Sequence, residues 1–139
     1  MEPTEENLFD NAMARYQAGE EASSLVEDFE AITTAAPNQA AGWTCLAWLL
    51  LLSDQPERAL RSARTAVKLN GQDPQARINL SLALLETKAK GVRDQIDIVQ
   101  KIISMVPELE EDLKTSIADG LNRKPNWKAL EKIKAWLVL

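Results

Sequence analysis

The chain has 139 residues, and its apolar fraction of 45% is enough for a hydrophobic core and too high for a disordered chain. It has one cysteine and no histidine, which excludes an internal disulfide, a metal site of the Cys/His type and Ser-His-Asp catalysis. Within the net charge of −5, the first 36 residues hold nine acidic side chains and one arginine, a local net charge of −8 that disfavours nucleic acid as a partner.

A helical spacing of apolar residues runs along the whole chain and is interrupted at glycines, prolines and short polar turns. Helices are expected at about residues 4–18, 23–36, 38–52, 56–69, 74–87, 94–106, 107–121 and 127–139. No segment has the pattern of a strand. The sequence therefore predicts an all-α fold of about eight helices.

Several helix starts have recognisable signals. Thr4, Asp73 and either Ser23 or Ser24 are expected to begin helices, since their short polar side chains suit the N-cap position. Prolines at the starts of the fourth and fifth predicted helices suit the first helical turn, where a missing N–H leaves no bond unmade. Asp94 is expected to begin the sixth helix.

The third predicted helix contains the most apolar stretch of the chain. Residues 43–52 carry no charge and only one hydroxyl group, that of Thr44. An amphipathic surface helix has an apolar stripe and a polar back, and this stretch has no polar back. We therefore expect it to be covered on nearly all sides. Its single thiol, Cys45, is interpreted as a buried structural group, because no base lies near it in the sequence.

Apolar positions recur at an interval of 34 residues. Phe9 lies 34 residues before Trp43, Tyr16 lies 34 before Leu50, and Leu50 lies 34 before Leu84. This interval, with the pattern W-x2-L-G-x2-Y followed by A-x3-F and P, resembles the tetratricopeptide repeat family. The best copy consists of Trp43, Leu46, Ala47 and Leu50, followed by Ala59, Ala63 and Ala66. Alanine replaces the small packing glycine and the second-helix aromatic of the pattern.

The resemblance implies a single domain over residues 1–139, built as a right-handed superhelix of antiparallel helix hairpins. Its repeats are expected at about residues 6–39, 40–73 and 74–109, with a C-terminal capping hairpin at 110–139. The resemblance further implies that the first helix of each repeat lines a concave groove. The groove residues that follow from the family register are Asp10, Ala14, Gln17, Thr44, Trp48, Leu51, Leu52, Ile78, Leu82 and Leu85.

Six of these groove positions carry large apolar side chains that are not needed for packing between repeats; they are Trp48, Leu51, Leu52, Ile78, Leu82 and Leu85. If exposed together, they would form a larger apolar patch than soluble monomers usually tolerate. One subset of the family binds carboxylate tails through lysine, asparagine and arginine, and the matching positions here do not fit; these are Asp10, Ala14, Cys45, Gln75 and Asn79. The groove is therefore expected to bind an apolar peptide or an amphipathic helix.

Three explanations for the patch remain open. A helix or tail of a partner protein fills it, or the chain's own last helix or a second copy fills it, or the register is shifted by one residue and the patch is ordinary core. The first makes the protein a non-catalytic interaction module or assembly adaptor, and the second a structural, self-associating protein, possibly a homodimer. We expect no enzyme activity, no cofactor and no metal. The longest apolar run, residues 45–52, is shorter than the ~20 residues of a membrane span, so a cytoplasmic location is expected.

Overall fold

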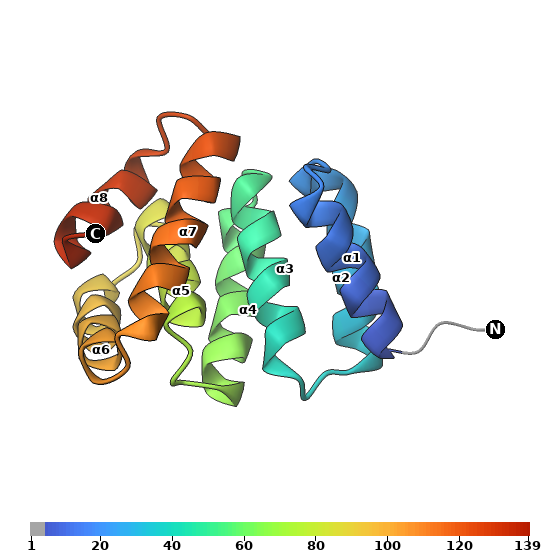
Figure 1. The fold of residues 1–139 in the computed structure, drawn as a ribbon, viewed down its shortest axis with the longest axis horizontal. Coiled ribbons are helices and arrows are strands. Elements are labelled where there is room, and N and C mark those ends of the chain that lie inside the picture. Colours follow the sequence, from blue (N-terminus) through green and yellow to red (C-terminus); the bar gives the residue numbers. More distant parts are fainter. Residues whose placement is uncertain (1–4) are drawn as a thin grey trace.

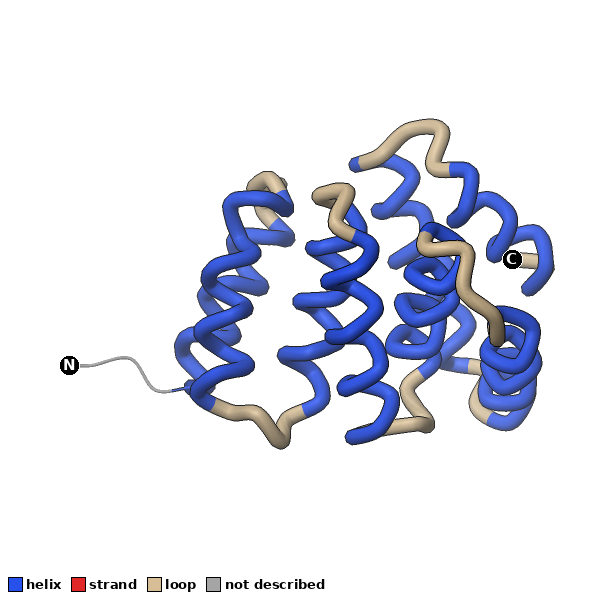
Figure 2. Tube along the Cα trace, turned by 180° about the vertical axis from the view of Figure 1, so that it is seen from behind, coloured by secondary structure: helices blue, strands red, loops and turns tan. Residues whose placement is uncertain are grey.

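A computed structural model describes residues 5–139 of the chain, and the all-α prediction is confirmed for this part (Figure 1). Seen from behind in Figure 2, its regular segments are all helices, joined by short loops. The expected cap at Thr4 lies outside the described residues. The helices are α1 (Glu5–Gln17), α2 (Ala22–Ala35), α3 (Ala40–Leu52), α4 (Pro56–Leu69), α5 (Pro74–Glu86), α6 (Val92–Met105), α7 (Glu108–Arg123) and α8 (Lys128–Leu137).

The expected signals at the starts of α4 and α5 are confirmed. Pro56 and Pro74 lie in the first turns of these two helices. The side chain of Asp73 caps α5, because its carboxylate accepts a hydrogen bond of 3.0 Å from the backbone N–H of Gln75. Such a cap satisfies one of the N–H groups that have no partner within the helix.

Two other predicted starts are wrong by one or two residues. α2 begins at Ala22, before both serines, and the Ser24 hydroxyl donates to the Glu21 carbonyl instead of accepting from an N–H. α6 begins at Val92, because Gly91 has the left-handed φ of +108° that places it just outside the helix. Asp94 then lies in the first turn, where its charge suits the helix dipole.

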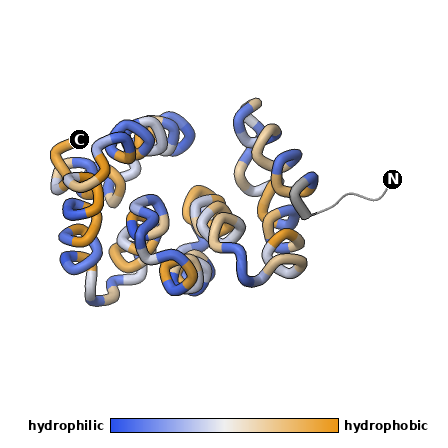
Figure 3. The backbone as a smooth tube through the Cα atoms, turned by 60° about the horizontal axis from the view of Figure 1, so that its bottom comes forward, coloured by the Kyte–Doolittle hydropathy of each residue, from blue (hydrophilic) through white to orange (hydrophobic). Residues whose placement is uncertain are grey.

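Successive helices pack against each other as antiparallel neighbours from α1 to α6. In Figure 3, where the helices are seen closer to end-on, they form a curved array whose N-terminal and C-terminal parts turn toward each other. The last helix does not simply extend the array, since α8 packs on α5 and α6 as well as on α7. This arrangement brings the C-terminal hairpin α7–α8 over the concave side of the earlier helices.

The core runs through the whole array as one large cluster that draws on helices from α1 to α8. The prediction that the apolar stretch of α3 is covered on nearly all sides is confirmed, since residues 46–51 are all buried. α3 packs against α2, α4 and α5. The largest side chains that are less than 2% exposed are Phe29, Leu25, Leu49, Leu50, Leu51, Ile78, Leu82, Leu113, Ile117, Leu130, Ile133 and Val99.

Candidate peptide-binding pocket

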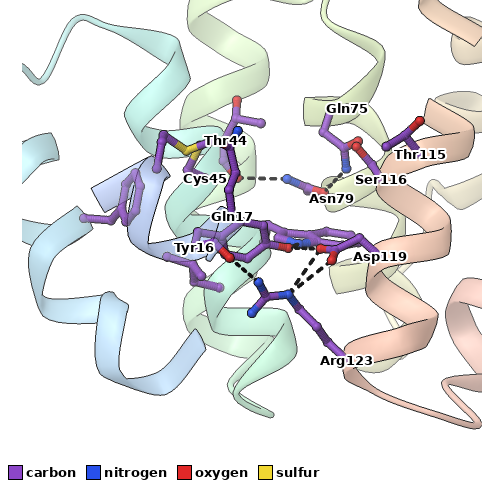
Figure 4. A pocket seen from close by; sticks show the side chains of 14 residues that line it. Tyr16, Gln17, Thr44, Cys45, Gln75, Asn79, Thr115, Ser116, Asp119 and Arg123 are labelled. Carbon is purple, nitrogen blue, oxygen red and sulfur yellow. Dashed lines mark hydrogen bonds and ion pairs between the residues drawn. The ribbon is translucent and has the colours of Figure 1, made fainter. Parts of the chain in front are cut away.

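A pocket of about 460 Å³ lies on the concave side, lined by residues of α1, α2, α3, α5 and α7 (Figure 4). This volume is in the range of sites that bind small ligands or short peptide segments. Its walls differ in chemistry. Side chains from α1, α2 and α3 form a mainly apolar wall, and side chains from α5 and α7 form a polar wall.

The apolar wall includes Met13, Phe29, Cys45 and Leu49. The Cys45 thiol lies 3.7 Å from the thioether sulfur of Met13. Burial raises the pKa of the Cys45 thiol to about 12, with a smaller contribution from the negative charge of Asp73. The thiol is therefore protonated near neutral pH and behaves as a small apolar group, not as a nucleophile.

On the polar wall, a short relay of amide groups begins at a backbone carbonyl. Asn79 donates from Nδ2 to the carbonyl oxygen of Thr44 at 2.9 Å, and its own Oδ1 accepts from Gln75 Nε2 at 2.8 Å. Because a carbonyl oxygen can only accept, it fixes the orientation of Asn79, and Asn79 in turn fixes that of Gln75. Among the described residues nothing donates to the buried Oε1 of Gln75, which is left as an unsatisfied acceptor.

At the other end of the pocket, a set of polar contacts connects α1 to α7. The Tyr16 hydroxyl accepts a hydrogen bond of 2.8 Å from Trp48 Nε1 and donates one to Asp119. Arg123 lies 3.3 Å from Asp119 through Nε, and its guanidinium carbon is 3.8 Å from the centre of the Tyr16 ring. It also donates to the Tyr16 carbonyl at 2.5 Å and to the Glu20 carbonyl at 2.9 Å. We call Tyr16, Asp119 and Arg123 the latch.

The two charges of the latch are paired with each other. The charges of Asp119 and Arg123 face each other, so neither is left to attract a charged ligand. Burial of the Tyr16 ring, followed by the hydrogen bond to Asp119, raises the pKa of Tyr16 above its usual value of about 10. The hydroxyl is therefore protonated at neutral pH and remains a hydrogen-bond donor.

Beside the pocket, the C-terminal hairpin covers Trp48. The rings of Trp48 and Trp127 are 5.5 Å apart, centre to centre. α7 approaches Trp48 most closely at Gly120, where an added Cβ would lie 2.7 Å from a ring carbon of Trp48 and 2.8 Å from a methyl of Leu130. Trp127 is itself held by a hydrogen bond of 2.5 Å from its Nε1 to Glu86.

The structure separates the ten groove residues predicted from the sequence into four groups. Gln17, Thr44 and Trp48 line the pocket together. Asp10 and Ala14 are exposed on α1 outside its lining, and Leu52 and Leu85 are half-buried. The remaining three, which are 0% exposed, are Leu51, Ile78 and Leu82.

In the part of the chain that the structure describes, the six apolar groove positions are not exposed together, as in the second of the three explanations, in which the chain's own C-terminal segment covers them. Trp48 is only 8% exposed, and Leu51, Ile78 and Leu82 belong to the same core cluster as Leu130. The physical reason is the position of the C-terminal hairpin, which buries these side chains. Whether any of the ten residues contacts a partner stays a prediction, and the fully buried ones could do so only after a rearrangement.

Sequence reasoning did not select most of the residues that shape the pocket. It placed Gln75 and Asn79 on the groove only as positions that do not fit a carboxylate tail, and those it missed are Tyr16, Thr115, Ser116, Asp119 and Arg123. A usable signal was present in α7, where polar residues recur at i, i+1, i+4 and i+8 from Thr115 while Leu113 and Ile117 occupy the opposite face. A helix with this pattern is expected to pack its apolar face on the core and to turn its polar face toward a different, polar surface.

No group of three or more acidic or cysteine side chains placed to hold a metal ion occurs in the described part of the chain. From residue 5 onward, no helix is both long enough and apolar enough to span a membrane.

Comparison with solved structures identifies the architecture. The translocator chaperone SycD of type III secretion in Yersinia enterocolitica superimposes with a TM-score of 0.69 and 20% identity, covering 95% of this chain and 92% of that one. PcrH, in complex with the chaperone binding region of PopD, gives 0.69 and 18%, covering 94% and 90%. The first TPR of Spaghetti, bound to an HSP90 peptide, gives 0.52 and 15%, covering 95% and 91%.

The chain has a tetratricopeptide-repeat fold. At these identities the similarity concerns the fold alone. No family model matches the sequence, and no curated protein matches it either.

Proposed function

We propose that the protein is a non-catalytic, cytoplasmic adaptor that binds a short apolar segment of a partner protein in the pocket between α1, α3, α5 and α7. The observation that carries this proposal is the pocket itself, a cavity of about 460 Å³ with one apolar wall and one hydrogen-bonding wall. A peptide backbone offers N–H and C=O groups to the polar wall, and an apolar side chain packs on the other.

The polar wall favours an extended segment over a helix. In a helix the backbone N–H and C=O groups bond to each other along the chain. An extended segment leaves these groups free to bond with the polar wall, which includes Gln75, Asn79, Thr115 and Ser116.

Charge argues against an acidic or basic ligand at this point. The two charged side chains that line the pocket, Asp119 and Arg123, are paired with each other. A charged ligand group would lose water without gaining an unpaired counter-charge. The segment is therefore uncharged where it enters the pocket.

The similar structures support a peptide-binding role. SycD has been solved in complex with a peptide of the translocator YopD, PcrH with the chaperone binding region of PopD, and the Spaghetti repeat with an HSP90 peptide. The alternative, a structural protein whose groove is filled by its own last helix, accounts for the buried Trp48 and Leu82. It does not account for the pocket beside them, which the last helix leaves unfilled.

A test is selection of a random dodecapeptide phage library against the purified protein, followed by calorimetric titration of the enriched peptides. We expect apolar, uncharged peptides to be enriched. The binding variant is Ser116→Phe, because Ser116 lines the pocket and a phenyl ring there would occupy it.

Ser104→Phe serves as the matched control, since Ser104 is an exposed helical serine that does not line the pocket. Binding should be lost in the first variant and kept in the second. The proposal fails if the library yields no enriched peptide, or if the enriched peptides bind both variants equally well.

A further inference from the structure

We propose that access to the pocket is gated, and that the latch of Tyr16, Asp119 and Arg123 is the gate. In the state described above, α1 and α7 are joined over one end of the pocket. In an open state the latch is broken and α1 separates from α7. This inference rests on the proposed function, since a gate matters only if a segment has to enter.

The latch joins the two ends of the array. Tyr16 and Asp119 are 103 residues apart in the sequence, and Arg123 bonds to the Tyr16 carbonyl across 107 residues. α1 packs chiefly on α2, while α7 packs on α8, α5 and α6. The latch is thus a contact between two hairpins, each of which keeps its own packing when the contact breaks.

The surface that α7 presents to the pocket is polar. The four residues of α7 that line the pocket are Thr115, Ser116, Asp119 and Arg123. Its buried residues are Leu113, Ile117 and Gly120, which occupy the other face of the helix. If α1 is the element that moves, opening wets the polar groups of α7 and leaves its buried residues in place, with Gly120 still against Trp48. The apolar surface that this movement exposes is mainly that of the half-buried Tyr16 ring.

The amide relay adds a second reason for an open state. In the closed state, the buried Gln75 Oε1 has no donor among the described residues. An acceptor that is buried without a bond destabilises the state that buries it, because it has lost its water. Opening gives this oxygen access to water or to an N–H of an entering segment.

Cys45 provides a reporter of opening, because it is the only cysteine of the chain and lines the pocket. The experiment measures the rate at which N-ethylmaleimide modifies Cys45 in the intact, peptide-free protein at one fixed pH. Arg123→Ala and Asp119→Asn each remove charge-assisted bonds of the latch. We expect both variants to raise the rate of Cys45 modification on the order of ten-fold. Loss of one charge-assisted hydrogen bond changes the equilibrium between closed and open states by about this factor.

The matched control is Arg15→Ala. Arg15 also makes ion pairs, with Glu20 and Asp28, but it does not line the pocket. We expect this variant to react at the wild-type rate. Urea unfolding of every variant supplies the global unfolding constant, so that reaction through complete unfolding can be recognised.

The proposal is overturned if the two latch variants react no faster than the wild type, or if their rates rise only in proportion to their global unfolding constants. Tyr16→Phe gives an independent comparison, because it keeps the ring and removes the hydroxyl that donates to Asp119. It should accelerate the reaction as well. No peptide is used, so failure of the gate and failure of peptide binding are separate results.

Discussion

At the scale of single residues, the Tyr16 hydroxyl connects three helices, since it accepts from Trp48 on α3 and donates to Asp119 on α7. Its raised pKa means that the folded state favours the protonated phenol. Tyr16 therefore stabilises the folded state fully at any pH below about 10, the pKa of tyrosine in the unfolded chain. This stabilisation is lost as the pH rises through the higher pKa of Tyr16 in the folded state. The contribution of Tyr16 to the latch is therefore expected to be lost only in alkaline solution.

This titration can be observed directly, because Tyr16 is the only tyrosine. We predict that phenolate absorbance near 295 nm rises with a midpoint well above pH 10 in the wild type. Asp119→Asn removes the negative charge that holds the phenolic proton, so the midpoint should move down toward 10. Asp28→Asn, which lies outside the latch, should leave it unchanged. An unaltered midpoint in Asp119→Asn would contradict the assigned hydrogen bond.

The sequence pattern assigned Tyr16 to a packing position of the first repeat, and its ring is indeed packed against the core. The pattern could not predict the partner of its hydroxyl. Asp119 lies 103 residues away, and the pairing depends on how far the array curves. Asp73, in contrast, was predictable as a cap because it bonds to Gln75, two residues away.

At the scale of elements, α8 is the helix that converts an exposed groove into a covered one. It carries an apolar stripe of Leu130, Ile133 and Leu137, all buried against the rest of the chain. Periodicity predicted this helix and its stripe. It could not predict that the stripe would pack on α5 and α6, because the direction of α8 is set by the turn at residues 124–127 and by the contact of Trp127 with Trp48.

Shortening a buried side chain of this apolar stripe should therefore destabilise the whole protein. We predict that Leu130→Ala lowers the free energy of unfolding by about 2–5 kcal/mol, the usual loss for a fully buried leucine. Lys132→Ala, on the exposed face of the same helix, should change it by less than about 0.5 kcal/mol. Urea unfolding followed by circular dichroism measures both. Equal, small effects would mean that α8 is not docked in solution.

At the scale of the whole molecule, the array is held at both of its ends. Repeat arrays ordinarily have contacts only between neighbours, so their end hairpins open independently of the middle. Here the latch connects the first hairpin to the last, and a separate ion pair of 2.5 Å joins Lys124 to Asp54 in the turn between α3 and α4. The first hairpin should consequently be protected more strongly than an end hairpin with one neighbour.

Hydrogen exchange tests this connection. In Arg123→Ala we predict that the amides of α1 exchange on the order of ten-fold faster, while those of α5 in the middle of the array keep their wild-type rates. Arg15→Ala again serves as the control with intact latch residues. Uniformly faster exchange in all helices would indicate general destabilisation, and unchanged exchange in α1 would show that the latch does not hold it.

Contact between the first and last hairpins also fixes how many helix hairpins the protein can contain. Neighbouring helices are spaced about 8–10 Å apart, so duplication of the hairpin α3–α4 would move α1 roughly 10 Å farther along the array. Tyr16 would then lie far beyond hydrogen-bond reach of Asp119 and Arg123. A protein of this design cannot lengthen by repeat duplication without losing its latch, whereas an open solenoid can grow by any number of units.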